Sequence, residues 1–285
     1  MSRLFAFIQY FLPHHFITSF MGVIGESKFA KRFLIRFFIK IYEIDMTDAR
    51  YNSIDQYPNF NAFFTRELRE GARPIDHSPR VIVSPADGTL SAVGRINNDR
   101  LIQAKNHYFS CSDLLGGNVS LANTFNDGNF ATIYLSPKDY HRVHMPLKGI
   151  LLKTIHIPGR LFSVGHATSS NIPNLFARNE RLVCVFSSNA GLFCLIFVGA
   201  MVVGSIKTIW SNGTPKVFAN PEIREIDYQS REMYVNLRKG AEVGHFELGS
   251  TVIVLFEQDL MQLNSNMLAS KPIRMGESFG LISDN

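Results

Sequence analysis

Cysteine is scarce in this chain: three residues of 285, Cys111, Cys184 and Cys194, with no CxxC pair among them. So sparse and odd a set provides neither a disulfide framework nor a zinc ribbon, and it favours a reducing compartment. Charged residues are also few, at 19%, against 46% hydrophobic residues. Disordered and low-complexity chains have the opposite balance, so both classes are excluded.

Long uninterrupted hydrophobic runs are absent as well. Residues 4–12 are apolar except for Gln9, and the polar sequence Pro-His-His follows at 13–15. A membrane-spanning helix needs ~20 nearly continuous apolar residues. A signal peptide needs small residues at a cleavage site after its apolar core, and none follow here. The sequence therefore predicts an N-terminal anchor that lies at a membrane surface, without spanning it.

The N-terminal region is rich in phenylalanine, with nine of the 24 before residue 40. The spacing predicts a helix over 28–42 with a stripe of cations at Lys28, Arg32, Arg36 and Lys40. Its apolar face holds Phe29, Ala30, Phe33, Leu34, Phe37, Phe38 and Ile41. Such a helix either packs on its own domain or lies in a bilayer interface. The net charge of +5 is mild, and its clustering among aromatic residues indicates a membrane surface and no nucleic acid.

Beyond about residue 75 the sequence is typical of β structure. Short apolar runs rich in Val, Ile and Phe occupy 81–83, 130–135, 149–157, 182–186, 192–198, 201–208 and 251–256. Few helices are expected there, chiefly at 111–115 and around 174–179. We therefore predict a mainly β (α+β) fold: a helical, membrane-associating region over 1–74, followed over 75–285 by one large β domain closed as a barrel or sandwich.

Three places concentrate reactive residue types. Asp87 lies in the turn Ser-Pro-Ala-Asp-Gly at 84–88, a sequence that is also typical of an ordinary β-hairpin turn. His141 and His144 are three residues apart, without a third metal ligand in register. On an extended segment they would point to opposite faces and have different roles. An equally weighted alternative is that both histidines are structural residues near a strand end and have no catalytic role.

The third place is the step from Gly249 to Ser250, which opens an apolar strand. Most such steps are simply turns that enter a strand. Glycine, however, places no side chain beside its carbonyl and tolerates strained backbone, so a neighbouring hydroxyl can approach the carbonyl carbon. Ser250 could then attack the peptide bond that precedes it.

Together these segments resemble a known family. The resemblance rests on Ser-Pro-Ala-Asp-Gly at 84–88, Tyr-His-Arg-Val-His-Met-Pro at 140–146, Asn-Leu-Phe-Ala-Arg-Asn-Glu-Arg at 174–181 and Leu-Gly-Ser-Thr at 248–251. In this order they closely resemble the bacterial phosphatidylserine decarboxylases, with similarity from about residue 59 to residue 256. One departure is Gly165, where many members carry asparagine near the substrate end of the site.

The resemblance implies that the chain makes its own cofactor. Ser250 would attack the carbonyl carbon of Gly249, with His144 as the base and Asp87 fixing the imidazole, as in a serine-protease triad. The resulting ester would eliminate, and residue 250 would lose ammonia to become an N-terminal pyruvoyl group. The products would be a large chain, 1–249, and a small chain, 250–285, which remain together as a heterodimer.

The resemblance also implies the reaction that follows. The pyruvoyl group would form a Schiff base with the amine of phosphatidylserine and accept the electrons released as CO₂ leaves. His141 would return a proton, and phosphatidylethanolamine would be the product. Neither metal nor pyridoxal phosphate is needed. The partners would be phosphatidylserine and the acidic surface of the inner membrane on its cytoplasmic side, where the enzyme is peripheral. A higher oligomer is left open.

Two alternatives remain from the sequence. One keeps the pyruvoyl group at Ser250 but takes a soluble amino acid as substrate. The other is a non-catalytic β domain that binds acidic lipid, in which Ser250 simply opens a strand. The aromatic, basic N-terminal region has no evident use for a soluble substrate. An uncleaved chain would favour the second alternative.

Overall fold

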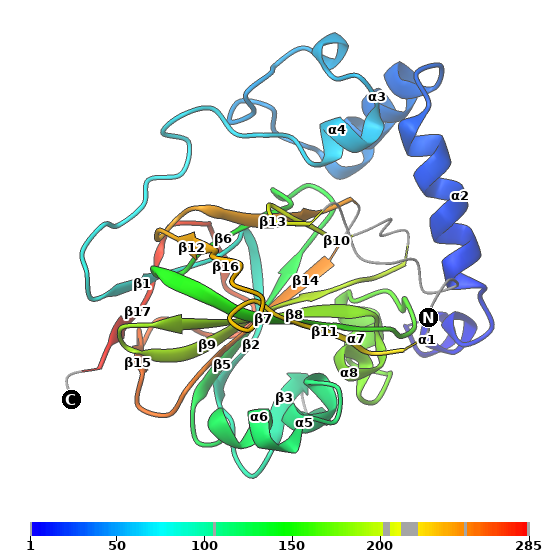
Figure 1. Ribbon diagram of the computed structural model, residues 1–285. Helices are drawn as coiled ribbons and strands as arrows, with labels where there is room; N and C mark the ends of the chain where they lie inside the picture. Colours follow the sequence, from blue (N-terminus) through cyan, green and yellow to red (C-terminus); the bar gives the residue numbers. More distant parts are fainter. Residues whose placement is uncertain (1, 105–106, 202–205, 212–221, 248–249, 284–285) are drawn as a thin grey trace.

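The computed structural model describes residues 2–104, 107–201, 206–211, 222–247 and 250–283 (Figure 1). Helices come first, namely α1 (Ser2–Gln9), α2 (His14–Glu26), α3 (Lys31–Tyr42), the 3-10 helix η1 (Ile54–Gln56) and α4 (Phe60–Phe64). The helix predicted over 28–42 thus begins at Lys31. None of the described helices has the length and apolar character needed to cross a bilayer.

Strands make up most of the regular structure after residue 80. They are β1 (Val81–Val83), β2 (Gly88–Arg95), β3 (Arg100–Ala104), β4 (His107–Ser110), β5 (Asn129–Leu135), β6 (Arg142–His144), β7 (Gly149–Ile157), β8 (Arg181–Ser188), β9 (Gly191–Val198), β10 (Ile206–Thr208), β11 (Arg224–Asp227), β12 (Asn236–Leu237), β13 (Glu242–Phe246), β14 (Ser250–Phe256), β15 (Met261–Leu263), β16 (Pro272–Ile273) and β17 (Ser278–Ile282). Four short helices interrupt them, α5 (Cys111–Leu114), α6 (Val119–Thr124), α7 (His166–Ser169) and α8 (Leu175–Arg178). The predicted mainly β fold is confirmed, and each predicted apolar run contains a strand, although 202–205 lie outside the described residues.

The largest sheet has nine strands, antiparallel throughout, in the order β11-β7-β8-β9-β14-β5-β2-β16, with β12 also paired to β7. The predicted closure of the β domain into a barrel is wrong. No pairing among the described strands joins the two edges, which are formed by β11 and β12 on one side and by β16 on the other. Closure requires edge strands that pair along a shared register, and these edge strands are only two to four residues long.

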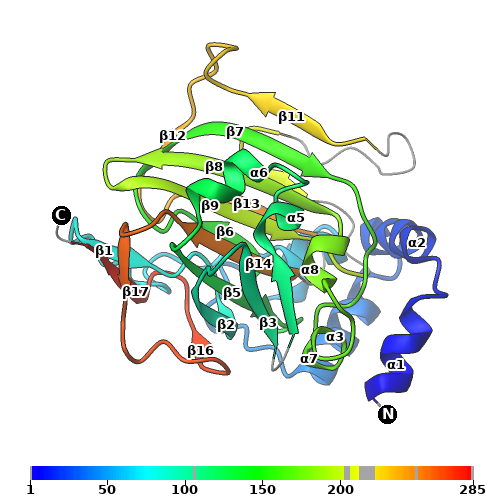
Figure 2. The same cartoon turned by 90° about the horizontal axis from the view of Figure 1, so that it is seen from below.

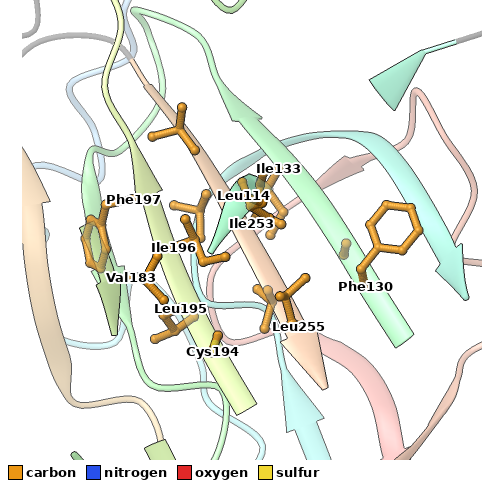
Figure 3. Close-up of a cluster of buried hydrophobic side chains, with 14 of the residues drawn as sticks. Leu114, Phe130, Ile133, Val183, Cys194, Leu195, Ile196, Phe197, Ile253 and Leu255 are labelled. Carbon is orange, nitrogen blue, oxygen red and sulfur yellow. The ribbon is translucent and has the colours of Figure 1, made fainter. Parts of the chain in front are cut away.

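The nine-stranded sheet is covered on both faces. The sheet β10-β13-β6 lies over one face, and α5, α6 and the β3-β4 hairpin lie over the other (Figures 1 and 2). Central β14 is consequently buried along its whole length, which explains its uninterrupted apolar run. Figure 3 shows Ile253 and Leu255 of β14 among side chains of β5, β9 and α5. Each such side chain stabilises the fold by about 1.5–3 kcal/mol through burial.

The N-terminal region packs around a second, smaller apolar cluster. Its buried members are Ile35, Ile44, Tyr57, Phe60, Phe63 and Phe64. Helix α1 instead reaches the main domain, where Ala6 joins the large core and the helix contacts α7. The helices α1 to α3 lie along one flank of the molecule (Figure 1). This arrangement brings the loop after α4 close to the turn that carries Asp87, as described next.

Candidate functional site

Ser250 is the first residue of β14 and lies opposite Leu135 of β5. Its side chain is fully buried, and its Oγ has no hydrogen-bond partner among the described residues. Gly249, the other half of the predicted cleavage step, lies outside the described residues. A buried hydroxyl without a partner forgoes about 1–3 kcal/mol, so it needs an explanation such as a chemical role.

His144, on β6, is held from both sides of its ring. Its Nδ1 lies 2.8 Å from the carbonyl oxygen of Gly240, and its Nε2 lies 2.9 Å from the hydroxyl of Tyr140. A carbonyl can only accept, so Nδ1 carries the proton and Tyr140 donates to Nε2. Burial lowers the pKa of His144, with the Gly240 carbonyl opposing it, and burial raises the pKa of Tyr140. The imidazole is thus neutral at pH 7, with its lone pair on Nε2, as a general base requires.

Asp87 makes different contacts from those predicted. Its Oδ1 and Oδ2 accept from Arg73 Nε at 3.0 Å and Nη2 at 2.6 Å, and Oδ1 also accepts from the backbone N–H of Met275 at 2.8 Å. Among the described residues it makes no hydrogen bond to His144. Arg73, from the loop after α4, presents a planar fork of N–H donors that matches a carboxylate. The hydrogen bond from His144 Nδ1–H is accepted by the Gly240 carbonyl instead of Asp87.

The turn and β6 are nevertheless neighbours. The backbone N–H of His144 donates to the carbonyl of Pro85 at 2.8 Å, two residues before Asp87 in the same turn. The Asp87 charge also raises the pKa of His144, as the smallest of the contributions. The structure therefore brings the turn beside the histidine, with a backbone carbonyl in the position assigned to the carboxylate. The roles of Asp87, His144 and Ser250 in cleavage stay predictions.

His141 lies completely buried, with its ring stacked on Phe64 of α4 at 4.0 Å between centroids. Neither ring nitrogen has a hydrogen-bond partner among the described residues. Burial, and after it the charge of Arg66, lowers the pKa of His141 to about 3, although the nearby backbone of Pro137 and Ser136, too poorly aligned for regular hydrogen bonds, opposes the shift. The imidazole is neutral here, so an approaching anion that raises its pKa would be needed for proton donation. That role also stays a prediction.

A cavity of about 300 Å³ lies beside Asp87, between the N-terminal region and the β domain. Its charged lining includes Asp48, Asp87 and Asp139 as well as Arg66, Arg73 and Lys138. Arg66 is buried and donates from Nη2 to the Lys138 carbonyl at 2.9 Å, and its Nη1 has no partner among the described residues. A larger cavity, of about 620 Å³, is lined by none of the predicted site residues.

Sequence reasoning missed three of these groups. Tyr140 stands in the recognised motif at 140–146, four residues before His144, but was assigned no role. Arg73 and Gly240 carry no local signal, because each reaches the site from a distant segment.

Known proteins provide independent evidence. A family model described as phosphatidylserine decarboxylase matches residues 60–281, and a second model, described as PSD, matches residues 4–43. The chain is 48% identical over 284 residues to the phosphatidylserine decarboxylase proenzyme of Pseudomonas fluorescens Pf-5, with 98% of each chain covered. It is 47% identical over 286 residues to that of Ectopseudomonas mendocina, again with 98% of each covered.

The corresponding Pseudomonas aeruginosa LESB58 proenzyme is 45% identical over 284 residues, covering 98% of this chain and 97% of that one. These matches extend over the helical N-terminal region as well as the β domain. Together with the buried serine at the head of β14 and the neutral histidine on β6, they lead to one conclusion. This chain belongs to the phosphatidylserine decarboxylase family.

Proposed function

We propose that this chain is a proenzyme that cleaves itself before Ser250 and then decarboxylates phosphatidylserine to phosphatidylethanolamine and CO₂. The observation that carries the proposal is the Ser250 hydroxyl, buried without a described partner at the head of the central strand, in a chain whose relatives are named proenzymes. A serine in that position lowers the stability of the fold, and its unpaired hydroxyl is available as a nucleophile.

His144 is the base in this scheme. Its Nε2 takes the Ser250 proton once the Tyr140 hydroxyl moves aside, while the Gly240 carbonyl keeps the other ring proton on Nδ1. The pair of Asp87 and Arg73 supports the turn beside β6. The pyruvoyl group formed at residue 250 supplies an electron sink for the pair left behind by CO₂. His141 then returns a proton to the substrate carbon.

The two products of cleavage stay together as a heterodimer. The small chain provides β14, which pairs with β9 on one side and β5 on the other. It also provides β16, which pairs with β2, and β17, which pairs with β1. So short a chain cannot hold a core alone, and separating it would expose the centre of the large sheet.

The N-terminal helices are proposed to hold the enzyme on the cytoplasmic side of the inner membrane, as a peripheral protein. The exposed large apolar residues of these helices and of the turns between them include Leu4, Phe5, Phe7, Ile8, Phe11, Phe16, Phe20, Val23, Phe29, Phe33, Phe37 and Ile41. An exposed apolar surface of this extent is typical of a membrane or protein interface. The exposed cations Lys28, Arg36 and Lys40 add attraction to acidic lipid. If the substrate were a soluble amino acid, this exposed apolar surface would have no function.

Intact mass of the purified protein tests cleavage. We expect two polypeptides, 1–249 and 250–285, with the small one blocked at its N-terminus. Ser250→Ala should remain one inactive chain, and His144→Ala should cleave poorly because Ser250 loses its base. Ser265→Ala, an exposed serine of the small chain, is the matched control and should cleave normally. A full-length chain with decarboxylase activity would refute the scheme.

His141→Ala separates the two reactions. We expect this variant to cleave to completion, because the proposed base is His144, and yet to turn over phosphatidylserine at least 100-fold more slowly, the lower end for general acid catalysis. Release of CO₂ from labelled lipid measures the second step. Full turnover in the cleaved variant would remove His141 as the proton donor.

A further inference from the structure

Gln9 interrupts the apolar run of α1 on its buried side. Its side chain is completely buried, whereas Phe7 and Ile8 on the same helix are 60% and 45% exposed. Burial of an amide inside a surface anchor is unfavourable unless the amide is hydrogen-bonded. Anchoring at a bilayer would be served equally well by an apolar residue at this position, so anchoring alone does not explain Gln9.

The amide binds the loop 159–165 of the β domain. Gln9 Oε1 accepts from the backbone N–H of Ser163 at 3.0 Å. Next to it, Tyr10 packs against Phe162 at 5.3 Å between ring centroids, and Arg178 Nη1 donates to the Tyr10 hydroxyl at 3.1 Å. The Gln9 oxygen and the Tyr10 ring therefore meet the loop 159–165, while Gln9 Nε2 donates to the Sδ of Met201 at 4.0 Å. Phe7 and Ile8 of the same helix face outward.

The same loop is held from inside by Asn179. Its Nδ2 donates to the carbonyls of Phe162 and Gly199, each at 2.8 Å, and its Oδ1 accepts from the Phe162 N–H at 3.1 Å. Gly199 directly follows β9, whose last residue, Val198, pairs with Thr251. Hydrogen bonds, together with the peptide links from Ser163 to Phe162 and from Gly199 to Val198, thus connect the anchor helix to the residue after Ser250.

The far end of the loop also lies near the head of β14. A β-carbon built at Gly165 would lie 3.6 Å from the hydroxyl oxygen of Tyr134. Tyr134 pairs with Thr251, and the next residue, Leu135, pairs with Ser250. The loop that Gln9 holds therefore contacts the side chain of Tyr134, the β5 residue next to the one that pairs with Ser250.

We infer that Gln9 is a positioning residue for decarboxylation: its hydrogen bond to Ser163 ties the anchor helix to the loop beside residue 250. This inference rests on the proposed function. A bilayer that covers the apolar side of α1 stabilises the docked helix, and the docked helix fixes the loop against the lipid headgroup. Self-cleavage does not depend on this contact, because Ser250 and His144 lie on β14 and β6.

Gln9→Met tests the inference, since it keeps the side-chain volume and removes the acceptor. We expect complete self-cleavage, unchanged flotation with vesicles that contain phosphatidylserine, unchanged KM, and kcat about tenfold lower, the usual effect of losing one buried hydrogen bond. Gln9→Glu keeps an oxygen acceptor, and burial favours the neutral form of the new carboxyl, so kcat should stay within about threefold of wild type. Gln229→Met, an exposed glutamine changed in the same way, is the control.

Wild-type kcat in Gln9→Met would overturn the inference, as would a fall in kcat that matches a loss of cleavage or of vesicle binding. If Gln9→Met does not fold, Tyr10→Phe is the second test, because it removes the neighbouring hydrogen bond from Arg178. We then expect kcat to fall about threefold. An unchanged kcat in Tyr10→Phe would overturn the inference. The wild-type protein is measured alongside. Absence of cleavage or of CO₂ release there would refute the proposed function and not the role of Gln9.

Discussion

At the scale of single residues, the chemistry of the site depends on which atom forms a hydrogen bond with each ring nitrogen of His144. The Gly240 carbonyl fixes the proton of His144 on Nδ1, and burial keeps the ring neutral. Asp87 is engaged by Arg73 in an ion pair with both side chains at most 10% exposed. A buried carboxylate held in this way has little freedom to turn toward His144 unless Arg73 moves with it.

The lowered pKa of His144 predicts the pH dependence of self-cleavage. An ordinary histidine is half protonated near pH 6.5, whereas half-buried His144, with its lowered pKa, reaches that point only at a lower pH. The rate of self-cleavage should therefore fall to half at a pH below 6.5. Cleavage of freshly made precursor between pH 5 and 8, followed on gels, measures this. A rate that halves near pH 6.5 would contradict the lowered pKa.

At the scale of elements, α3 divides its apolar residues between two environments. Leu34, Ile35 and Phe38 pack into the cluster beneath the helix, whereas Phe33 and Phe37 are 71% and 52% exposed. Packing on the protein and lying in a bilayer are therefore compatible on one helix. Arg32 is paired with Asp55 at 2.7 Å, while Arg36 has no ion-pair partner among the described residues.

Membrane binding by α3 should have an apolar contribution and an electrostatic contribution that can be measured separately. Phe33→Ser should weaken flotation with phosphatidylserine vesicles about tenfold or more, independently of salt, because it removes a large apolar side chain. Arg36→Gln should weaken it by up to about fivefold at low salt and not at 0.5 M salt, since the attraction to acidic lipid is screened. Arg32→Gln, whose charge is already paired, is the control for Arg36. Equal flotation of all three would indicate that α3 does not face the bilayer.

At the scale of the whole molecule, buried neutral histidines couple stability to pH. Burial lowers the pKa of His14 to about 4 and that of His141 to about 3. Both take up a proton on unfolding, where the ordinary pKa is about 6.5. Their contribution to stability is complete above pH 6.5 and is lost as the pH falls toward these lowered values.

Stability should therefore decrease between pH 6.5 and pH 5, approaching about 2.7 kcal/mol per pH unit where both histidines are protonated on unfolding. His14→Phe should remove about half of this slope, because the His14 ring lies edge-on against Phe162 and its nitrogens have no hydrogen-bond partner among the described residues. Chemical denaturation of single-chain Ser250→Ala protein measures it. An unchanged slope in His14→Phe would contradict the lowered pKa.

The sequence by itself determined the features that repeat over short distances. Apolar runs set off by turn residues predicted the strands, because burial on one or both faces of a sheet leaves that pattern in the chain. Four motifs in order identified the family, and the Gly-Ser step placed Ser250 at the start of its strand. Each apolar run and each motif is a set of neighbouring residues in the chain, so the sequence alone contains it.

Only the tertiary structure decided which distant groups meet. It assigned the proton of His144 to the Gly240 carbonyl, 96 residues away, and the carboxylate of Asp87 to Arg73. It left the large sheet open and turned Gln9 of α1 toward Ser163. Hydrogen-bond donors compete for the same acceptor, and the winner is set by packing geometry in three dimensions, which no local pattern of residues records.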